Sequence, residues 1–155
     1  MTTLLLSLHV LAAIVAVGPV TVAASMFPPA VRRARAAGRD AAALGTVRLL
    51  HRICRVYAGV GLAVPVFGFA TASSLGVLGD AWLIASIVLT AAAAGVLALL
   101  VLPRQDALLE QPGGAAGSVA AGATGRLAML TGVFNLLWAA VTVLMIIRPG
   151  STTGV

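Results

Sequence analysis

Charged residues are scarce in this chain of 155 residues, and lysine is absent altogether. Asp and Glu together number 4, all ten basic residues are Arg, and charged residues make up only 9% of the sequence. A soluble domain carries about 25% charged residues. With 61% hydrophobic residues, the chain has too few polar side chains to cover a globule. This composition excludes a water-soluble enzyme and a disordered chain, and it predicts a protein whose solvent is a lipid bilayer.

Cysteine and membrane-embedded acids are also lacking. Cys54 is the only cysteine, so the chain has no intramolecular disulfide and no cysteine-pair metal site. The carboxylates lie between the apolar runs or, for Asp80, at the edge of one. A proton-coupled antiporter of four helices needs a carboxylate inside the membrane. The sequence therefore argues against that function class.

Four long uncharged runs define the predicted organisation. A helix needs about 20 apolar residues to cross the hydrocarbon core, and continuous apolar blocks argue against a transmembrane barrel. The predicted fold is therefore all-α, a polytopic bundle of four transmembrane helices that forms a single integral membrane domain over residues 1–155. The predicted spans are residues 4–27, 53–77, 81–102 and 127–147, with cytoplasmic loops at 28–52 and 103–126.

The arginines are distributed unevenly between the predicted loops. Seven lie between the first two spans, and Arg104 and Arg126 lie between the last two, whereas only Arg148 lies on the other side. By the positive-inside rule, this bias places both loops in the cytoplasm and both termini outside. It predicts a multi-pass protein of the bacterial cytoplasmic (inner) membrane, with an uncleaved first span. Nucleic acid is not expected as a partner, because no aromatic residue interleaves the arginines.

Arg48, Arg52 and Arg55 recur at i, i+4 and i+7, so they share one face of a helix that runs into the second span. Two interpretations stay open. The three side chains are an orientation signal that snorkels to the interface, or a lipid-facing basic site that binds anionic lipid at the cytoplasmic face. Pro28-Pro29 is predicted to end the first helix before this stretch.

Small residues and prolines within the spans predict helix contacts and kinks. Gly68, Ala72 and Gly76 repeat every four residues, which lets another helix approach closely. Pro65 cannot donate to the carbonyl of Gly61. In a bilayer that carbonyl needs another partner, so a kink is expected at Pro65, and another at Gly18-Pro19.

His9 is the one titratable side chain inside a predicted span, about 9 Å outward of its centre. It is a functional-site candidate or a neutral imidazole that bonds to a neighbouring helix. Its candidate partners on other helices at similar depth are Ser73, Ser86, Thr142 and Met145. With Met145, about 12 Å outside the centre, His9 could hold haem b or copper as Cu(I).

His51 cannot share a metal ion with His9. The two imidazoles are predicted to lie about 28 Å apart along the membrane normal, whereas two nitrogens on one metal lie about 4 Å apart. Near the inner boundary, a second group of soft-ligand side chains gathers instead, consisting of Met26, His51, Cys54 and Met129.

Short stretches of each span carry a resemblance to a known family. They are Leu8-His9 with Ala and Gly after it, Val64-Pro65 with Gly68, Ala81-Trp82-Leu83, Leu102-Pro103-Arg104-Gln105 and Leu144-Met145-Ile146-Ile147-Arg148-Pro149. Through these stretches, most of the chain resembles an uncharacterised bacterial family of predicted four-span integral membrane proteins, a domain of unknown function. The resemblance implies a fold and a location but no activity.

The first span carries a second resemblance. Leu8-His9-Val10-Leu11-Ala12-Ala13 is similar to the opening helix of copper-resistance D domains and of the membrane protoporphyrinogen oxidase family. This similarity implies copper or haem at His9.

Two functions from different classes follow from the sequence. The first is a non-enzymatic integral membrane protein, without a cofactor, that self-associates as a homo-oligomer or is accessory to a larger membrane complex. The alternative is a haem- or copper-binding membrane redox or transport protein that uses His9. No catalytic residue and no resident metal are predicted.

Overall fold

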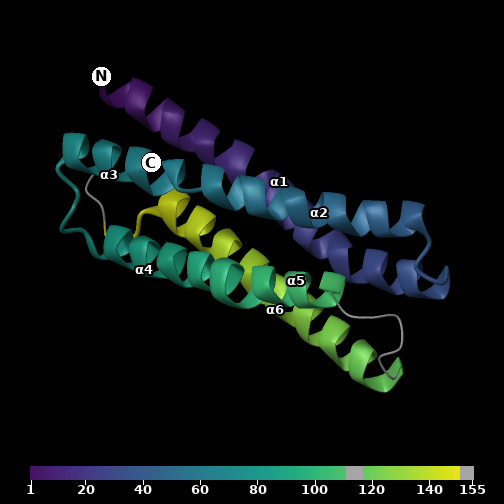
Figure 1. Cartoon of the computed structure of the whole chain (residues 1–155). Coiled ribbons are helices and arrows are strands. Elements are labelled where there is room, and N and C mark those ends of the chain that lie inside the picture. The colour runs from purple at the N-terminus through teal and green to yellow at the C-terminus, as the bar shows by residue number, and fades with distance from the viewer. Residues whose placement is uncertain (111–116, 151–155) are drawn as a thin grey trace.

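The computed structural model describes residues 1–110 and 117–150, which form helices joined by short turns and contain no β-strand. Four helices are long and apolar enough to cross a membrane, so the prediction of an all-α protein with four spans is confirmed. In chain order, the elements are α1 (Thr2–Ala36), α2 (Ala41–Val60), α3 (Ala63–Leu75), α4 (Ala81–Gly95), the π-helical segment η1 (Val96–Val101), α5 (Leu102–Glu110) and α6 (Gly117–Ile147) (Figure 1). The second span consists of α2 and α3 together, and the third consists of α4, η1 and α5.

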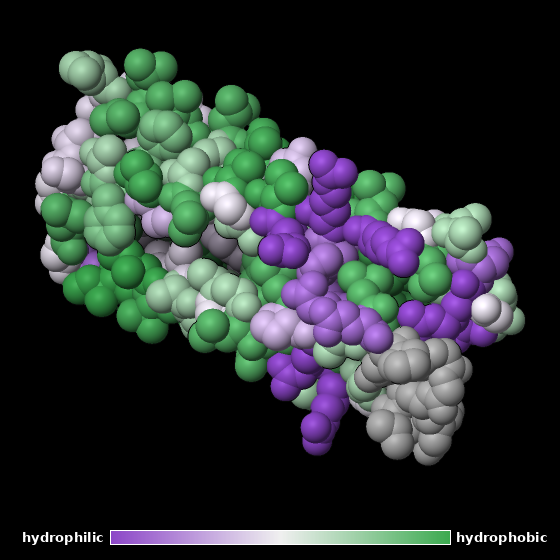
Figure 2. All heavy atoms as spheres, viewed as in Figure 1, coloured by the Kyte–Doolittle hydropathy of each residue, from purple (hydrophilic) through white to green (hydrophobic). Residues whose placement is uncertain are grey.

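The helices are longer than the predicted spans at the arginine-rich end. Segments 28–52 and 103–126, predicted as loops, are mostly helical in the described chain, and 111–116 lie outside it. With 35 residues, α1 is about 52 Å long, against about 30 Å of hydrocarbon. The helical parts of 28–52, 103–110 and 117–126 form what we call the helical extension, and Figure 2 shows hydrophilic residues gathered at that end of the molecule.

The prediction that Pro28-Pro29 ends the first helix is wrong, because α1 passes through both prolines. A proline inside a helix removes a backbone hydrogen bond. Here Phe27 and Val31, on either side of the pair, are buried in the same core cluster as Leu50 of α2. Burial of these side chains holds the helix together where local preference alone would end it.

The turn between α1 and α2 ends the first helix instead. Gly38 and Arg39 adopt positive φ angles of 66° and 60°. The Asp40 side chain then accepts a hydrogen bond of 2.7 Å from the backbone N–H of Ala43, which caps the first turn of α2. The two helices therefore return antiparallel through four residues.

The core is built from stripes of buried residues at alternating spacings of three and four. This spacing keeps side chains on one face of a helix in a left-handed bundle. Side chains such as Leu11, Ile14 and Leu136 are exposed on the outer faces, where a membrane protein meets lipid. On α6 the buried stripe is Thr124, Leu127, Thr131, Phe134 and Val141, and on α1 it is Ala16, Val20, Ala23, Phe27, Ala30 and Ala34.

The kink predicted at Pro65 is present as the break between α2 and α3. The carbonyl of Gly61, which cannot receive a hydrogen bond from Pro65, accepts one of 3.1 Å from the backbone N–H of Val64. This shorter, i to i+3 bond satisfies the freed group within the chain. Pro19, by contrast, lies inside the uninterrupted α1.

The π-helical segment η1 sets which residues of the third span face the interior. Ala93, Leu97, Val101 and Gln105 are all buried, at intervals of four residues. Twelve residues of α-helix overshoot three full turns by about 120°, and one extra residue in a wider turn reduces this mismatch to about 20°. The N–H of Leu102 donates to the carbonyl of Leu97, five residues back. The segment thus turns Gln105 inward.

Candidate functional site

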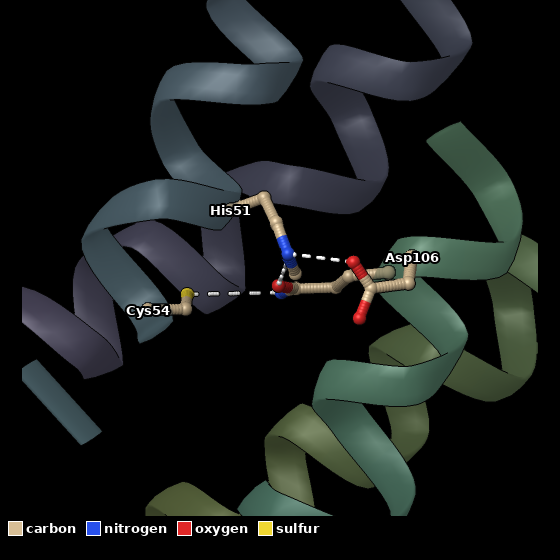
Figure 3. Close-up of polar contacts among 4 residues, drawn as sticks. His51, Cys54 and Asp106 are labelled. Atoms are coloured by element: carbon tan, nitrogen blue, oxygen red, sulfur yellow. Dashed lines mark hydrogen bonds and ion pairs between the residues drawn. The ribbon is translucent and has the colours of Figure 1, made fainter. Parts of the chain in front are cut away.

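Four polar side chains meet where α2 passes α5, and we call this group the His51 site. It consists of His51 and Cys54 from α2 and of Gln105 and Asp106 from α5 (Figure 3). His51 Nδ1 lies 2.9 Å from Gln105 Oε1, and His51 Nε2 lies 2.8 Å from Asp106 Oδ1. The Gln105 amide nitrogen donates to Cys54 Sγ at 3.7 Å. Three of the four residues are buried, whereas the Asp106 side chain is 47% exposed.

The periodicity of α2 explains how the site forms. Val47, Leu50, His51 and Cys54 are buried at i, i+3, i+4 and i+7, which places them on one face of the helix. On the other side of the imidazole lies Phe27 of α1, whose ring stands edge-on at a centroid distance of 6.5 Å. His51 is therefore enclosed between an aromatic ring and the polar end of α5.

Each ring nitrogen of His51 faces a hydrogen-bond acceptor. The amide oxygen of Gln105 and the carboxylate of Asp106 are both acceptors, and each faces one ring nitrogen. A neutral imidazole carries only one N–H, whereas the imidazolium carries two. The carboxylate lies off the direction of a ring N–H, so that Nε2 makes a close ionic contact without a regular hydrogen bond.

The members of the second group of soft ligands differ in their surroundings. His51 and Cys54 belong to the His51 site, but Met26 and Met129 are 49% and 63% exposed. Within residues 1–110 and 117–150, no three His, Cys, Asp or Glu side chains are placed to hold a metal ion.

His9 packs against α3 and bonds to the backbone. Its Nδ1 lies 2.9 Å from the carbonyl oxygen of Val64. Because a carbonyl only accepts, Nδ1 carries the proton, and a neutral ring then has its lone pair on Nε2. The predicted side-chain partners are engaged elsewhere, since Ser86 and Thr142 donate to carbonyls of their own helices.

The three small residues of the second span have different surroundings. A Cβ atom on Gly68 would lie 2.9 Å from His9 Cε1, so this glycine makes room for the imidazole. Ala72 is buried in a small cluster with Trp82 and Leu83. Gly76 ends α3 with a φ of 71°, and no atom lies within 4 Å of the position of its Cβ.

Met145 packs at the opposite end of the bundle from the His51 site. It lies against the cluster of Ala72, Trp82 and Leu83. Next to it, the Trp82 indole N–H donates to Asp80 at 2.9 Å, and the Arg148 guanidinium lies 5.6 Å from the centre of the Trp82 ring. The structure describes no contact between Met145 and His9.

Arg48, Arg52 and Arg55 are all exposed on α2. They alternate with the buried residues of the His51 site, so the basic face and the buried face lie on different sides of the same helix. Their interaction with lipid stays a prediction.

Gln105 and Asp106 were missed by the sequence analysis, because residues 103–126 were predicted as a loop. The available signal was the run from Leu102 to Glu110, in which helix-forming residues follow Pro103.

Comparison of the chain with family models, with curated proteins and with solved structures finds no significant match.

Proposed function

We propose that the chain is a non-enzymatic, multi-pass protein of the bacterial cytoplasmic membrane that self-associates or serves as an accessory subunit of a larger membrane complex. The observation that carries the proposal is the small buried share of its apolar spans. In the 18-residue apolar window of each span, at most 28% is buried, and in that of the second span only 11% is. Most of the apolar surface is thus available to lipid and to neighbouring proteins.

The association itself is testable in native membranes. The protein, tagged with one fluorophore per chain and extracted in polymer-bounded lipid discs, is expected to bleach in two or more steps or to co-migrate with a larger complex. A particle that bleaches in one step and contains no second protein would contradict the proposal. The mass of one chain is 15.5 kDa, so that even a dimer is readily distinguished.

The proposed orientation predicts the outcome of reporter fusions. A reporter that is active only outside the cytoplasm is expected to work after Val155 or at Asp80, and to fail at Ala42. The reason is the bias of nine arginines against one. Reporter activity at Ala42 would reverse the orientation, and the matched fusions at Asp80 and Val155 control for expression.

The basic face of α2 is proposed to bind anionic lipid. Replacing Arg48, Arg52 and Arg55 by Gln is expected to weaken retention of phosphatidylglycerol, measured by quenching with brominated lipids. The loss should be about 1 kcal/mol per charge near the surface, which is about fivefold for each residue. The matched control replaces Arg32, Arg33 and Arg126, which are also exposed. An equal loss in both triple variants would mean that Arg48, Arg52 and Arg55 only help to orient the chain and do not form a lipid-binding site.

A second candidate function, binding of haem b or copper, is favoured by the orientation of His9. Ligating histidines commonly donate their other ring N–H to a backbone carbonyl, as His9 does to Val64. The fit is incomplete, because Met145 packs in a different cluster. Among the described residues at this position, His9 would thus supply one imidazole ligand to haem b or copper.

An absorption spectrum and a copper assay of the purified protein separate the two functions. The wild type is expected to carry no stoichiometric haem or copper, and His9→Gln is expected to fold normally. Loss of the Val64 hydrogen bond should cost only about 0.6 kcal/mol, the average for interhelical hydrogen bonds in membranes. A haem spectrum that disappears in His9→Gln would favour the second function.

A further inference from the structure

The His51 site has two arrangements in which each ring nitrogen faces a group of matching polarity, and they differ by one proton. In the arrangement observed, the acceptors Gln105 Oε1 and Asp106 Oδ1 lie 2.9 Å from Nδ1 and 2.8 Å from Nε2 of the ring, and the Gln105 amide nitrogen donates to Cys54 Sγ. This arrangement requires an imidazolium, because a carboxylate and an amide oxygen accept and do not donate.

A neutral ring does not fit the observed arrangement. With its proton on Nδ1, the ring would turn the lone pair of Nε2, which is buried, toward the Asp106 carboxylate. With its proton on Nε2, it would turn the lone pair of Nδ1 toward Gln105 Oε1, 2.9 Å away. In either tautomer, two acceptors face each other inside the protein.

Rotation of the Gln105 amide by half a turn removes this conflict. The amide nitrogen then donates to His51 Nδ1, and His51 Nε2–H faces the Asp106 carboxylate. The amide oxygen now faces Cys54, whose S–H group can donate to it. Cys54 thereby changes from a hydrogen-bond acceptor to a donor.

We propose that His51 is a proton-binding site of the helical extension, and that release of its proton is accommodated by rotation of the Gln105 amide and by a reversal of the Cys54 hydrogen bond. The ligand is a proton. It reaches the ring past Asp106, whose side chain is 47% exposed.

The charged groups around the site favour this assignment. Asp106 of α5 is the charged group that contacts the ring within the described chain, and α1 contributes the uncharged ring of Phe27. On α2, the side chains of Arg48, Arg52 and Arg55 are exposed, away from the buried face. On α5, the Arg104 guanidinium is turned back to the carbonyl of Leu100.

Cys54 is the only cysteine, so that its S–H stretching band reports on this site alone. The test records infrared spectra of the full chain in vesicles of phosphatidylethanolamine and phosphatidylglycerol, between about pH 5 and pH 8, where histidine titrates. As the pH rises, the band is expected to shift to lower wavenumber, because the S–H group begins to donate. The shift should follow a single-proton titration.

Two variants and one further measurement separate the outcomes. His51→Gln is expected to abolish the pH response of the band. Gln105→Leu is expected to abolish it as well, while the nitrogen NMR signals of a labelled His51 still titrate. Asn135→Leu, which removes an amide that bonds to Ser25 in another part of the bundle, should leave the response intact.

The wild type alone decides the proposal if a variant fails to fold. A wild-type band that does not move while the His51 signals titrate would overturn it, since Asp106 would then simply turn to water. Failure of His51 to titrate in this range would overturn it too. Neither result bears on the proposed association in the membrane, which is measured by bleaching.

Discussion

Replacing Gly68 with leucine is expected to separate the N-terminal half of α1 from α3 and to lower the stability of the bundle by about 1–3 kcal/mol or more, the range for overpacked interiors. Even a Cβ atom at this position would lie 2.9 Å from His9 Cε1 and 3.2 Å from His9 Nδ1. The imidazole would have to leave the carbonyl of Val64, to which it is bonded. The free energy of unfolding in mixed detergent micelles, followed by circular dichroism, measures the effect.

The chain offers a matched control for this substitution. Gly59 is also a glycine of the second span, but it is exposed and no atom lies within 4 Å of the position of its Cβ. Gly59→Leu is therefore expected to be nearly neutral. In the double variant His9→Ala, Gly68→Leu, the obstructing ring is gone, so most of the loss should be recovered. Equal stability of the Gly68 and Gly59 variants would contradict a close His9 contact.

The number and type of the spans could be predicted because hydropathy and length depend on local sequence. The helical extension could not, because it is held by contacts between distant residues. Phe27 and Val31 pack with Leu50, and no local rule indicates that this burial outweighs two adjacent prolines. The arginines identify the end of the molecule where this occurs, but they do not distinguish a loop from a helix.

The candidate sites show the same limit. His9 could be identified because an ionisable side chain inside a span is unusual. Its partner could not, because it is the backbone carbonyl of Val64, and every residue has a carbonyl. Depth along the membrane normal placed His51 and Cys54 near each other. Gln105 and Asp106 reach them only through the rotation that η1 adds to the third span.

Insertion of one alanine after Leu102 is expected to turn Gln105 about 100° away from His51, because each further residue of α-helix adds about 100° of rotation. His51 would lose the acceptor at 2.9 Å from Nδ1, which costs about 1–3 kcal/mol for a buried polar group. Leu108, buried on the same side of α5, would leave the core at a cost of about 1.5–3 kcal/mol. We therefore expect a loss of about 3–5 kcal/mol in the free energy of unfolding.

Cys54 provides a second measurement of this insertion. In the wild type its side chain is buried and bonded to Gln105, so a maleimide should label it slowly, and the insertion should accelerate labelling at constant pH. Ala98→Leu, a substitution at an exposed position of η1, is the control for a changed side chain in this segment and should leave both measurements unchanged. Deletion of Ala98 in the insertion variant restores the number of residues between Ala93 and Gln105 and should restore protection of Cys54. An insertion variant with wild-type stability and a protected Cys54 would mean that the inward position of Gln105 does not depend on the rotation of α5.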